Sequence, residues 1–288
     1  MFPVRMLVAV DGSEGARRAA MLGARLAAAL GSELHVASVG RLPSGYGSPG
    51  WGPPHPNPEF DAVALARREA EERAREEALR LEEAGFAVIG VHAGTGDPES
   101  GIVALAEEIG AGLIVVGSRG LGALRRTLLG SVSEGVVRNA RCSVLVARGD
   151  SLPEKVLLAV DGSSESAAAA RMAAEICAAS GGELHAVYVV EGMRLGPMAW
   201  DVDEARVRRR ILAFLEGQTG PAQRKVVPRV HLKFGRADTG ITELEESLGA
   251  DLIVVGSRGL GGVRRALLGS VSGPVVRHAH CSVLVVHR

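Results

Sequence analysis

The sequence predicts an α/β protein made of two tandem, doubly wound, parallel sheet domains with five strands each. Two observations carry this prediction. Short apolar runs alternate with helix-like segments, which is the pattern of a parallel sheet covered by helices on both faces. The pattern also occurs twice: Leu7–Ala20 matches Leu157–Ala170, and Leu113–Ala147 matches Leu252–Val286 at 27 of 35 positions.

The repeat indicates a duplicated domain of about 140 residues, a common size for a single domain. The offset between matching residues falls from 150 near the start of each copy to 139 near its end, so the second copy is 11 residues shorter. Polar residues, glycine and proline in Arg148–Lys155 mark the boundary. We therefore expect domains at residues 1–149 and 155–288.

In the first half, Arg5–Val10 is an apolar run that predicts a strand, and Ser13 is a suitable N-cap for a helix to about Leu30. The proline-rich and glycine-rich segment Gly40–Pro58 is incompatible with regular structure and is read either as a lid over a site or as a surface linker. The other elements are expected at Glu33–Val39 (strand), Glu59–Ala84 (helix), Phe86–His92 (strand), Pro98–Gly110 (helix), Leu113–Val116 (strand), Ser131–Asn139 (helix) and Ser143–Ala147 (strand).

The second half repeats this order with a shorter middle helix near Asp201–Glu216. Right-handed crossovers restrict both halves to the doubly wound topology. The strands are expected near Val156–Val160, Glu183–Val190, Val226–Phe234, Leu252–Val255 and Ser282–Val286.

Composition limits the partners. The formal net charge is zero and aromatic residues make up 3%, which argues against nucleic acid as a partner. The chain has neither an apolar run of about 20 residues nor a secretory signal pattern, so we expect no membrane partner and a cytoplasmic location. Three cysteines do not make a disulfide framework or a zinc site.

The two copies share a glycine-rich loop, which reads GSRGLGALRRTLLGS at 117–131 and GSRGLGGVRRALLGS at 256–270. Each loop follows an apolar strand and precedes a helix, and free amides at such a junction favour an anion. Gly117 and Gly120 permit positive φ and let backbone amides approach phosphate oxygens without a Cβ in the way. Asp11 and Asp161 end the first strand of each half, so both loops and both aspartates should meet at the carboxyl edge of the sheet.

Other interpretations of the loop stay open. It lacks the Gly-Lys-Ser/Thr of a Walker A loop, and the Gly45, Gly47, Gly50 pattern lacks a flanking strand and helix. Glycines at a strand–helix junction also serve tight packing alone. Two copies predict two nucleotide sites, or one live site and one relic.

The G-x2-G-x9-G-S spacing, the AVDGS strand end and the CSVLV last strand resemble the universal stress protein family, and two copies resemble its tandem members. The resemblance implies the adenine-nucleotide alpha-hydrolase-like fold, pseudo-two-fold symmetry between the halves, and ATP, with Mg²⁺, as cofactor. It also implies an internal pseudo-dimer through the last strands, and it leaves a further homodimer open. The residues that it implies for nucleotide binding are Asp11, Val39, Gly117, Arg119, Gly120, Gly130, Ser131, Val132 and Ser133, and in the second half Asp161, Val189, Gly256, Arg258, Gly259, Gly269, Ser270, Val271 and Ser272.

The expected function is an ATP-binding stress-response or signalling module, with one or two sites and no efficient catalysis. No G-x-S-x-G or H-E-x-x-H motif is present. One alternative is a weak ATPase or a protein that phosphorylates itself at Ser131 or Ser270. The other is a nucleotide-free scaffold with vestigial loops.

Overall fold

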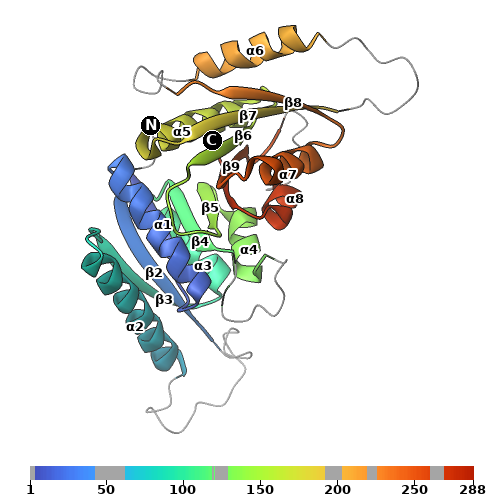
Figure 1. Ribbon diagram of the computed structural model, residues 1–288. Helices are drawn as coiled ribbons and strands as arrows, with labels where there is room; N and C mark the ends of the chain where they lie inside the picture. The colour runs from blue at the N-terminus through green and yellow to red at the C-terminus, as the bar shows by residue number, and fades with distance from the viewer. Residues whose placement is uncertain are drawn as a thin grey trace.

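Ten strands form one mixed sheet in the structure of the protein, which is a computed structural model (Figure 1). The structure describes residues 4–42, 62–118, 120, 129–191, 203–218, 226–259 and 269–288. The strand order is β3-β2-β1-β4-β5-β10-β9-β6-β7-β8, so each half contributes five strands. The strands are β1 (Arg5–Ala9), β2 (Glu33–Arg41), β3 (Gly90–Gly96), β4 (Leu113–Gly117), β5 (Ser143–Ala147), β6 (Lys155–Ala159), β7 (Glu183–Val190), β8 (Arg229–Phe234), β9 (Leu252–Gly256) and β10 (Ser282–Val286).

The halves meet where β5 and β10 pair. This pairing is antiparallel, with Leu145 opposite Leu284, whereas the other strand pairings between described residues are parallel. Because β10 also pairs with β9, backbone hydrogen bonds run across the sheet from β3 to β8. Pairing removes the two strand edges that separate domains would expose at this point.

Helices cover both faces of the sheet, as the strand–helix alternation predicts. The helices α1, α2, α5 and α6 pack on one face, and α3, α4, α7 and α8 on the other. Their bounds are α1 (Glu14–Leu30), α2 (Ala62–Glu83), α3 (Pro98–Glu108), α4 (Ser131–Asn139), α5 (Ser164–Ser180), α6 (Glu204–Glu216), α7 (Ala237–Leu248) and α8 (Ser272–His278). Within the described ranges, no helix is both long and apolar enough to span a bilayer.

The first helix of each half begins and ends by the signals that the sequence carries. The Ser13 hydroxyl accepts from the Ala16 amide at 3.1 Å, and Gly31 ends α1 at a positive φ of 68°. In the second half Ser163 and Gly181 do the same for α5. The caps satisfy amides and carbonyls that a helix end leaves without partners.

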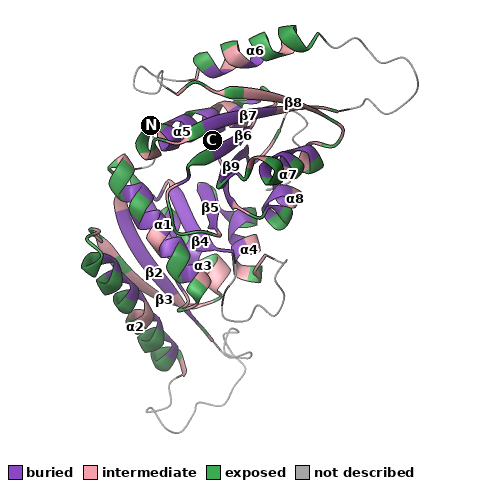
Figure 2. Cartoon of the chain, viewed as in Figure 1, coloured by how far each residue is buried: buried purple, intermediate pink, exposed green. Residues whose placement is uncertain are grey.

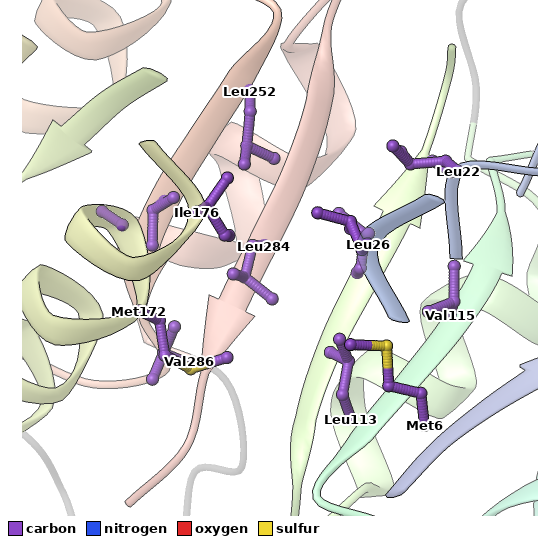
Figure 3. Close-up of a cluster of buried hydrophobic side chains, with 14 of the residues drawn as sticks. Met6, Leu22, Leu26, Leu113, Val115, Met172, Ile176, Leu252, Leu284 and Val286 are labelled. Carbon is purple, nitrogen blue, oxygen red and sulfur yellow. The ribbon is translucent and has the colours of Figure 1, made fainter. Parts of the chain in front are cut away.

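A continuous apolar core joins the halves. Figure 3 shows Leu22, Leu26 and Val115 of the first half in the same cluster as Ile176 and Leu284 of the second half. Burial follows the sheet in Figure 2, where the central strands are fully buried and the outer faces of α2 and α6 are exposed. The packing that places the site thus depends on both halves.

The third strand of the first half was expected at Phe86–His92, but β3 begins at Gly90. Gly85 ends the preceding helix with a φ of 89°, and the Phe86 amide then donates to the Leu81 carbonyl. Phe86 and its neighbours are therefore an apolar connection packed against the core, and pairing with β2 starts only opposite His35. In the second half a strand was expected at Val226–Phe234, and the corresponding strand β8 begins at Arg229.

Candidate functional site at the carboxyl edge of the sheet

The predicted aspartate and glycine meet in both halves. A Cβ built on Gly120 would lie 2.3 Å from Oδ2 of Asp11, and one built on Gly259 would lie 2.6 Å from Oδ2 of Asp161. Asp11 follows β1 and Gly120 follows β4, which are neighbours in the sheet. The two strands are parallel, and successive strands are added on opposite sides of this pair, β2 and β3 on one side and β5 on the other. Doubly wound sheets bind ligands at such a point.

Each aspartate also shapes its own turn. Oδ1 of Asp11 accepts from the Ser13 amide at 3.0 Å, and the next residue, Gly12, has a φ of 84°. Asp161 repeats this contact with Ser163 at 2.9 Å. One carboxylate oxygen is therefore used in the turn, and the other faces the glycine loop.

Gly117 is not among the described glycines with positive φ, so the conformational freedom that glycine permits is not what this position uses. Close packing explains Gly117 instead. A Cβ there would lie 2.7 Å from the carbonyl carbon of Gly15, at the start of α1. A Cβ on Gly120 would displace the Asp11 carboxylate oxygen. The first glycine of the loop therefore serves packing, and the second leaves open the space beside Asp11.

The loop ends on a helix start in the first half. Gly130 is the N-cap of α4, its amide donates to the Ser118 carbonyl at 2.8 Å, and Ser131 and Val132 open the first turn. Ser131 is exposed, whereas Ser133 is buried and its hydroxyl donates to the Gly117 carbonyl at 2.6 Å. Ser131 is therefore exposed at the start of α4, and Ser133 fastens the helix to the strand end.

Replacing Ser133 by alanine is expected to lower the free energy of unfolding by about 1–2 kcal/mol, because it removes the buried bond to Gly117. The matched control is Ser131→Ala, an exposed serine on the same helix, which is expected to change it by less than about 0.5 kcal/mol. Urea unfolding followed by circular dichroism measures both. Equal losses in the two variants would contradict the fastening role.

The second half departs from this arrangement. Its helix α8 begins at Ser272, not at Ser270, and Val271 is the N-cap. Pro274 stands where the first half has Gly135 and has no amide to donate to the Ser270 carbonyl. The hydroxyl of Ser272 donates to the Ser257 carbonyl and accepts from the Gly269 amide, both at 3.1 Å.

The remaining predicted residues lie around these contacts. Val39 and Val189 are half-buried near the carboxyl ends of β2 and β7, and each packs against a glycine, Gly101 and Gly240 respectively. Gly256 repeats the close packing of Gly117, here against Glu165. Arg119 lies outside the described residues, as do residues 43–58 of the proposed lid. The paired loop arginines, Arg125, Arg126, Arg264 and Arg265, also lie outside them.

Two residues at the second site were missed by the motif search. A Cβ on Gly256 would lie 2.9 Å from the Cβ of Glu165, where the first half has Gly15. Beyond β10, His287 stands where the first half has Arg148. Burial, helped by the positive charge of Arg258 and opposed by Glu165, lowers the pKa of His287 to about 4. Comparing the two repeats position by position would have found both residues.

The comparisons with known proteins follow the same two units. The model of the "Universal stress protein family" matches residues 4–148 and 153–287. A universal stress protein of Mycolicibacterium smegmatis is 38% identical over 186 residues, which are 61% of this chain and 62% of that protein, so the match spans less than two thirds of the relative. The crystal structure of a universal stress protein from Archaeoglobus fulgidus DSM 4304 matches over 100% of both chains, with 26% identity and a TM-score of 0.74.

A universal stress protein in complex with cAMP is 26% identical to this chain, over 48% of this chain and 98% of that one, with a TM-score of 0.37. The family model matches each half separately, and the two matches together cover nearly all residues of the chain. The crystal structure from Archaeoglobus fulgidus matches over the full length, so the tandem arrangement fits as well. The chain belongs to the universal stress protein family, as a member with two tandem domains.

Proposed function

We propose that this protein binds an adenine nucleotide, ATP with Mg²⁺, at the carboxyl edge of the sheet and acts as a stress-response or signalling module. The observation that carries the proposal is the duplicated meeting of an aspartate with the second loop glycine, Asp11 with Gly120 and Asp161 with Gly259. In each half the aspartate follows the first strand and the glycine follows the fourth, and these two strands are neighbours in the sheet.

The residues of the first half fit the nucleotide. The space beside Asp11 is one that a Cβ on Gly120 would fill, and the Asp11 carboxylate is suited to accept from ribose or adenine donors. The amides at the start of α4, together with the Ser131 hydroxyl, favour phosphate. No cluster of three or more metal-ligating side chains occurs among the described residues. Mg²⁺ would therefore arrive with the phosphates, which is its usual mode in nucleotide sites.

The internal pairing supports a second part of the proposal, that the two halves work as a pseudo-dimer in the cytoplasm. β5 and β10 pair antiparallel, and each makes a cross contact: the Arg148 amide donates to the Ser282 hydroxyl, and the His287 amide to that of Ser143. All three cysteines of the chain are free thiols, as in most proteins of a reducing compartment.

Isothermal titration of the full chain with Mg·ATP tests the binding, and mass spectrometry of nucleotide released from freshly purified protein identifies what it carries. We expect measurable heat at micromolar to millimolar ATP and a higher melting temperature with ligand, since a ligand of the folded state stabilises it. Absence of both at millimolar ATP would favour the nucleotide-free scaffold. Phosphate release that disappears in Ser131→Ala would favour the weak ATPase.

A further inference from the structure

Two pairs of histidines lie at corresponding places in the two halves. His35 of β2 meets His92 of β3, and His185 of β7 meets His231 of β8. In each pair, Nδ1 of the first ring lies 3.0 Å from Nε2 of the second. Each of these histidines is the third residue of its strand, whereas the candidate nucleotide sites lie at the carboxyl ends of the strands. The pairs are therefore separate from those sites.

The rings of each pair meet edge to edge. Their centres are 5.3 Å apart in the first pair and 5.2 Å apart in the second. This separation exceeds the 3.0 Å between the nitrogens by about twice the distance from a ring nitrogen to the ring centre, so both nitrogens lie close to the line between the centres. The ring planes differ by only 26° and 15°. This is the geometry of an N–H···N hydrogen bond, in which one ring donates and the other accepts.

A carboxylate fixes the protons of the second pair. Oε2 of Glu183 lies 3.3 Å from Nε2 of His185, and an ionised carboxylate only accepts, so this nitrogen carries a hydrogen. Nδ1 of the neutral His185 ring is then the acceptor, and His231 donates from Nε2. The basic nitrogen of the pair is therefore Nδ1 of His231, which belongs to a partly exposed ring.

The first pair has no such carboxylate contact. Oε2 of Glu33 lies 4.0 Å from Nε2 of His35 and instead accepts from Nε of Arg5 at 2.8 Å. The buried Nε2 of His35 has no hydrogen-bond partner among the described residues. The bond between the rings is thus the one printed contact that the two pairs share in full, and it is what a further proton can break.

The paired rings link the outermost strands to the rest of the sheet. β3 and β8 lie at the two ends of the strand order (Figure 1). Within the described ranges, β3 pairs with β2 and β8 pairs with β7, each on one side only. Strands with fewer contacts open more readily than central strands. A side-chain bond across each of these last pairings therefore contributes where the sheet is most easily opened.

We propose that the two histidine pairs are proton-binding sites that make the attachment of β3 and β8 sensitive to acid. A first proton leaves the N–H···N bond in place. A second proton puts a hydrogen on both facing nitrogens, so the bond is lost and two positive charges lie side by side. The proposal is independent of nucleotide binding, because the pairs lie towards the opposite ends of the strands.

The charges around the rings set the direction of the pH dependence. Burial and the partner ring lower the pKa of His35 and of His231 from the ordinary value of 6.5. At His35 the carboxylate of Glu33 opposes this shift and Arg5 adds to it. The cations that add to it at His231 are Arg208 of α6, Lys233 and Arg229. Because the folded protein binds these protons less readily than the unfolded chain, the stabilisation is complete above pH 6.5 and is lost as the pH falls below that value towards the lowered pKa.

NMR of the natural full chain tests the proton sites directly, since long-range ¹H–¹⁵N spectra show which ring nitrogen carries a hydrogen. At high pH we expect hydrogen on Nε2 of both His185 and His231. On acidification each pair should titrate in two steps, whereas His278, an exposed histidine on α8, should titrate in one. Single-step titration of all four paired rings, like that of His278, would overturn the proposal.

Hydrogen exchange, corrected for the intrinsic effect of pH, tests the consequence for the strands. We expect opening of β3 and β8 to increase by about tenfold or more relative to β1 and β4 between about pH 7.5 and pH 5.5, because each linked proton contributes up to about tenfold per pH unit. Equal acid responses of outer and central strands in the natural protein would contradict the proposal, whether or not any variant folds.

A double variant removes the second titrating ring of each pair. His92→Gln with His231→Gln places an amide there that can offer a donor or an acceptor and does not titrate. We expect the acid response of β3 and β8 to fall to that of the central strands. His278→Gln is the matched control and should keep the natural response. An unchanged acid response in the double variant would show that the pairs do not control the outer strands.

Discussion

Replacing Gly120 by valine is expected to weaken binding of Mg·ATP to the first site by roughly 100-fold, equivalent to about 2.7 kcal/mol. Even the first atom of the new side chain would lie 2.3 Å from Oδ2 of Asp11. The carboxylate must then move, and the valine methyls occupy the space where a nucleotide would meet it. Two binding determinants are lost through one substitution.

The atoms that a Cβ on Gly120 would meet are those of the Asp11 carboxyl group, not backbone. A folded variant is therefore expected, and its melting temperature without ligand should stay near that of the natural protein. The matched control is Gly149→Val, because a Cβ at this exposed glycine meets nothing within 4 Å. Calorimetry with Mg·ATP measures both variants, and undiminished affinity in Gly120→Val would show that the loop does not cradle the ligand.

Local signals in the sequence were sufficient for the first helix of each half. Serine at Ser13 and Ser163 and glycine at Gly31 and Gly181 act within a few residues of the helix ends that they define. The duplicated pattern likewise predicted the five strands of each half, because apolar strand runs and their helices recur in the same order. Such features depend on short stretches of chain, so one sequence contains them.

Features set by distant contacts were not predictable in the same way. The apolar run after Gly85 reads as a strand, yet the pairing of β3 with β2 begins only at Gly90 opposite His35, and Phe86 and Val88 pack against the core instead. The role of Gly117 depends on the approach of Gly15, which is about 100 residues away in the chain. Spacing of glycines alone cannot distinguish packing against a helix from approach to a ligand.

The differences between the two sites could be predicted from the sequence only in part. Glu165 and His287 are visible as mismatches when the repeats are compared, but their meaning requires the fold, which brings α5, β9 and β10 together. Proline is tolerated in an early helical turn, and α8 contains Pro274 in its first turn. Its consequence, the later start of α8, follows from the missing amide. The sequence thus contained the asymmetry, and the structure shows why it bears on one edge of the sheet.

Leu284→Ala is expected to lower the free energy of unfolding by about 2–5 kcal/mol, the usual range for leucine in a close-packed core. Leu284 is 1% exposed, lies in β10, and faces Leu145 of the other half across the β5–β10 pairing. Figure 3 shows it close to Ile176 and Leu252. The cavity therefore opens where the core of one half joins that of the other.

The shared core predicts that the loss of stability in Leu284→Ala affects both halves of the protein. Because residues of both halves form one apolar cluster, we expect a single unfolding transition that moves to lower urea as a whole, with the first half losing as much protection from hydrogen exchange as the second. Val227→Ala, at a valine that is 78% exposed, is the control and should change stability by less than about 0.5 kcal/mol. Two separate transitions, with the β1–β4 region unaffected by Leu284→Ala, would show that the halves are independent domains that merely touch. A joint transition would mean that a ligand bound by one half stabilises the other through β5 and β10, which is the physical basis on which a tandem pair can respond as one unit.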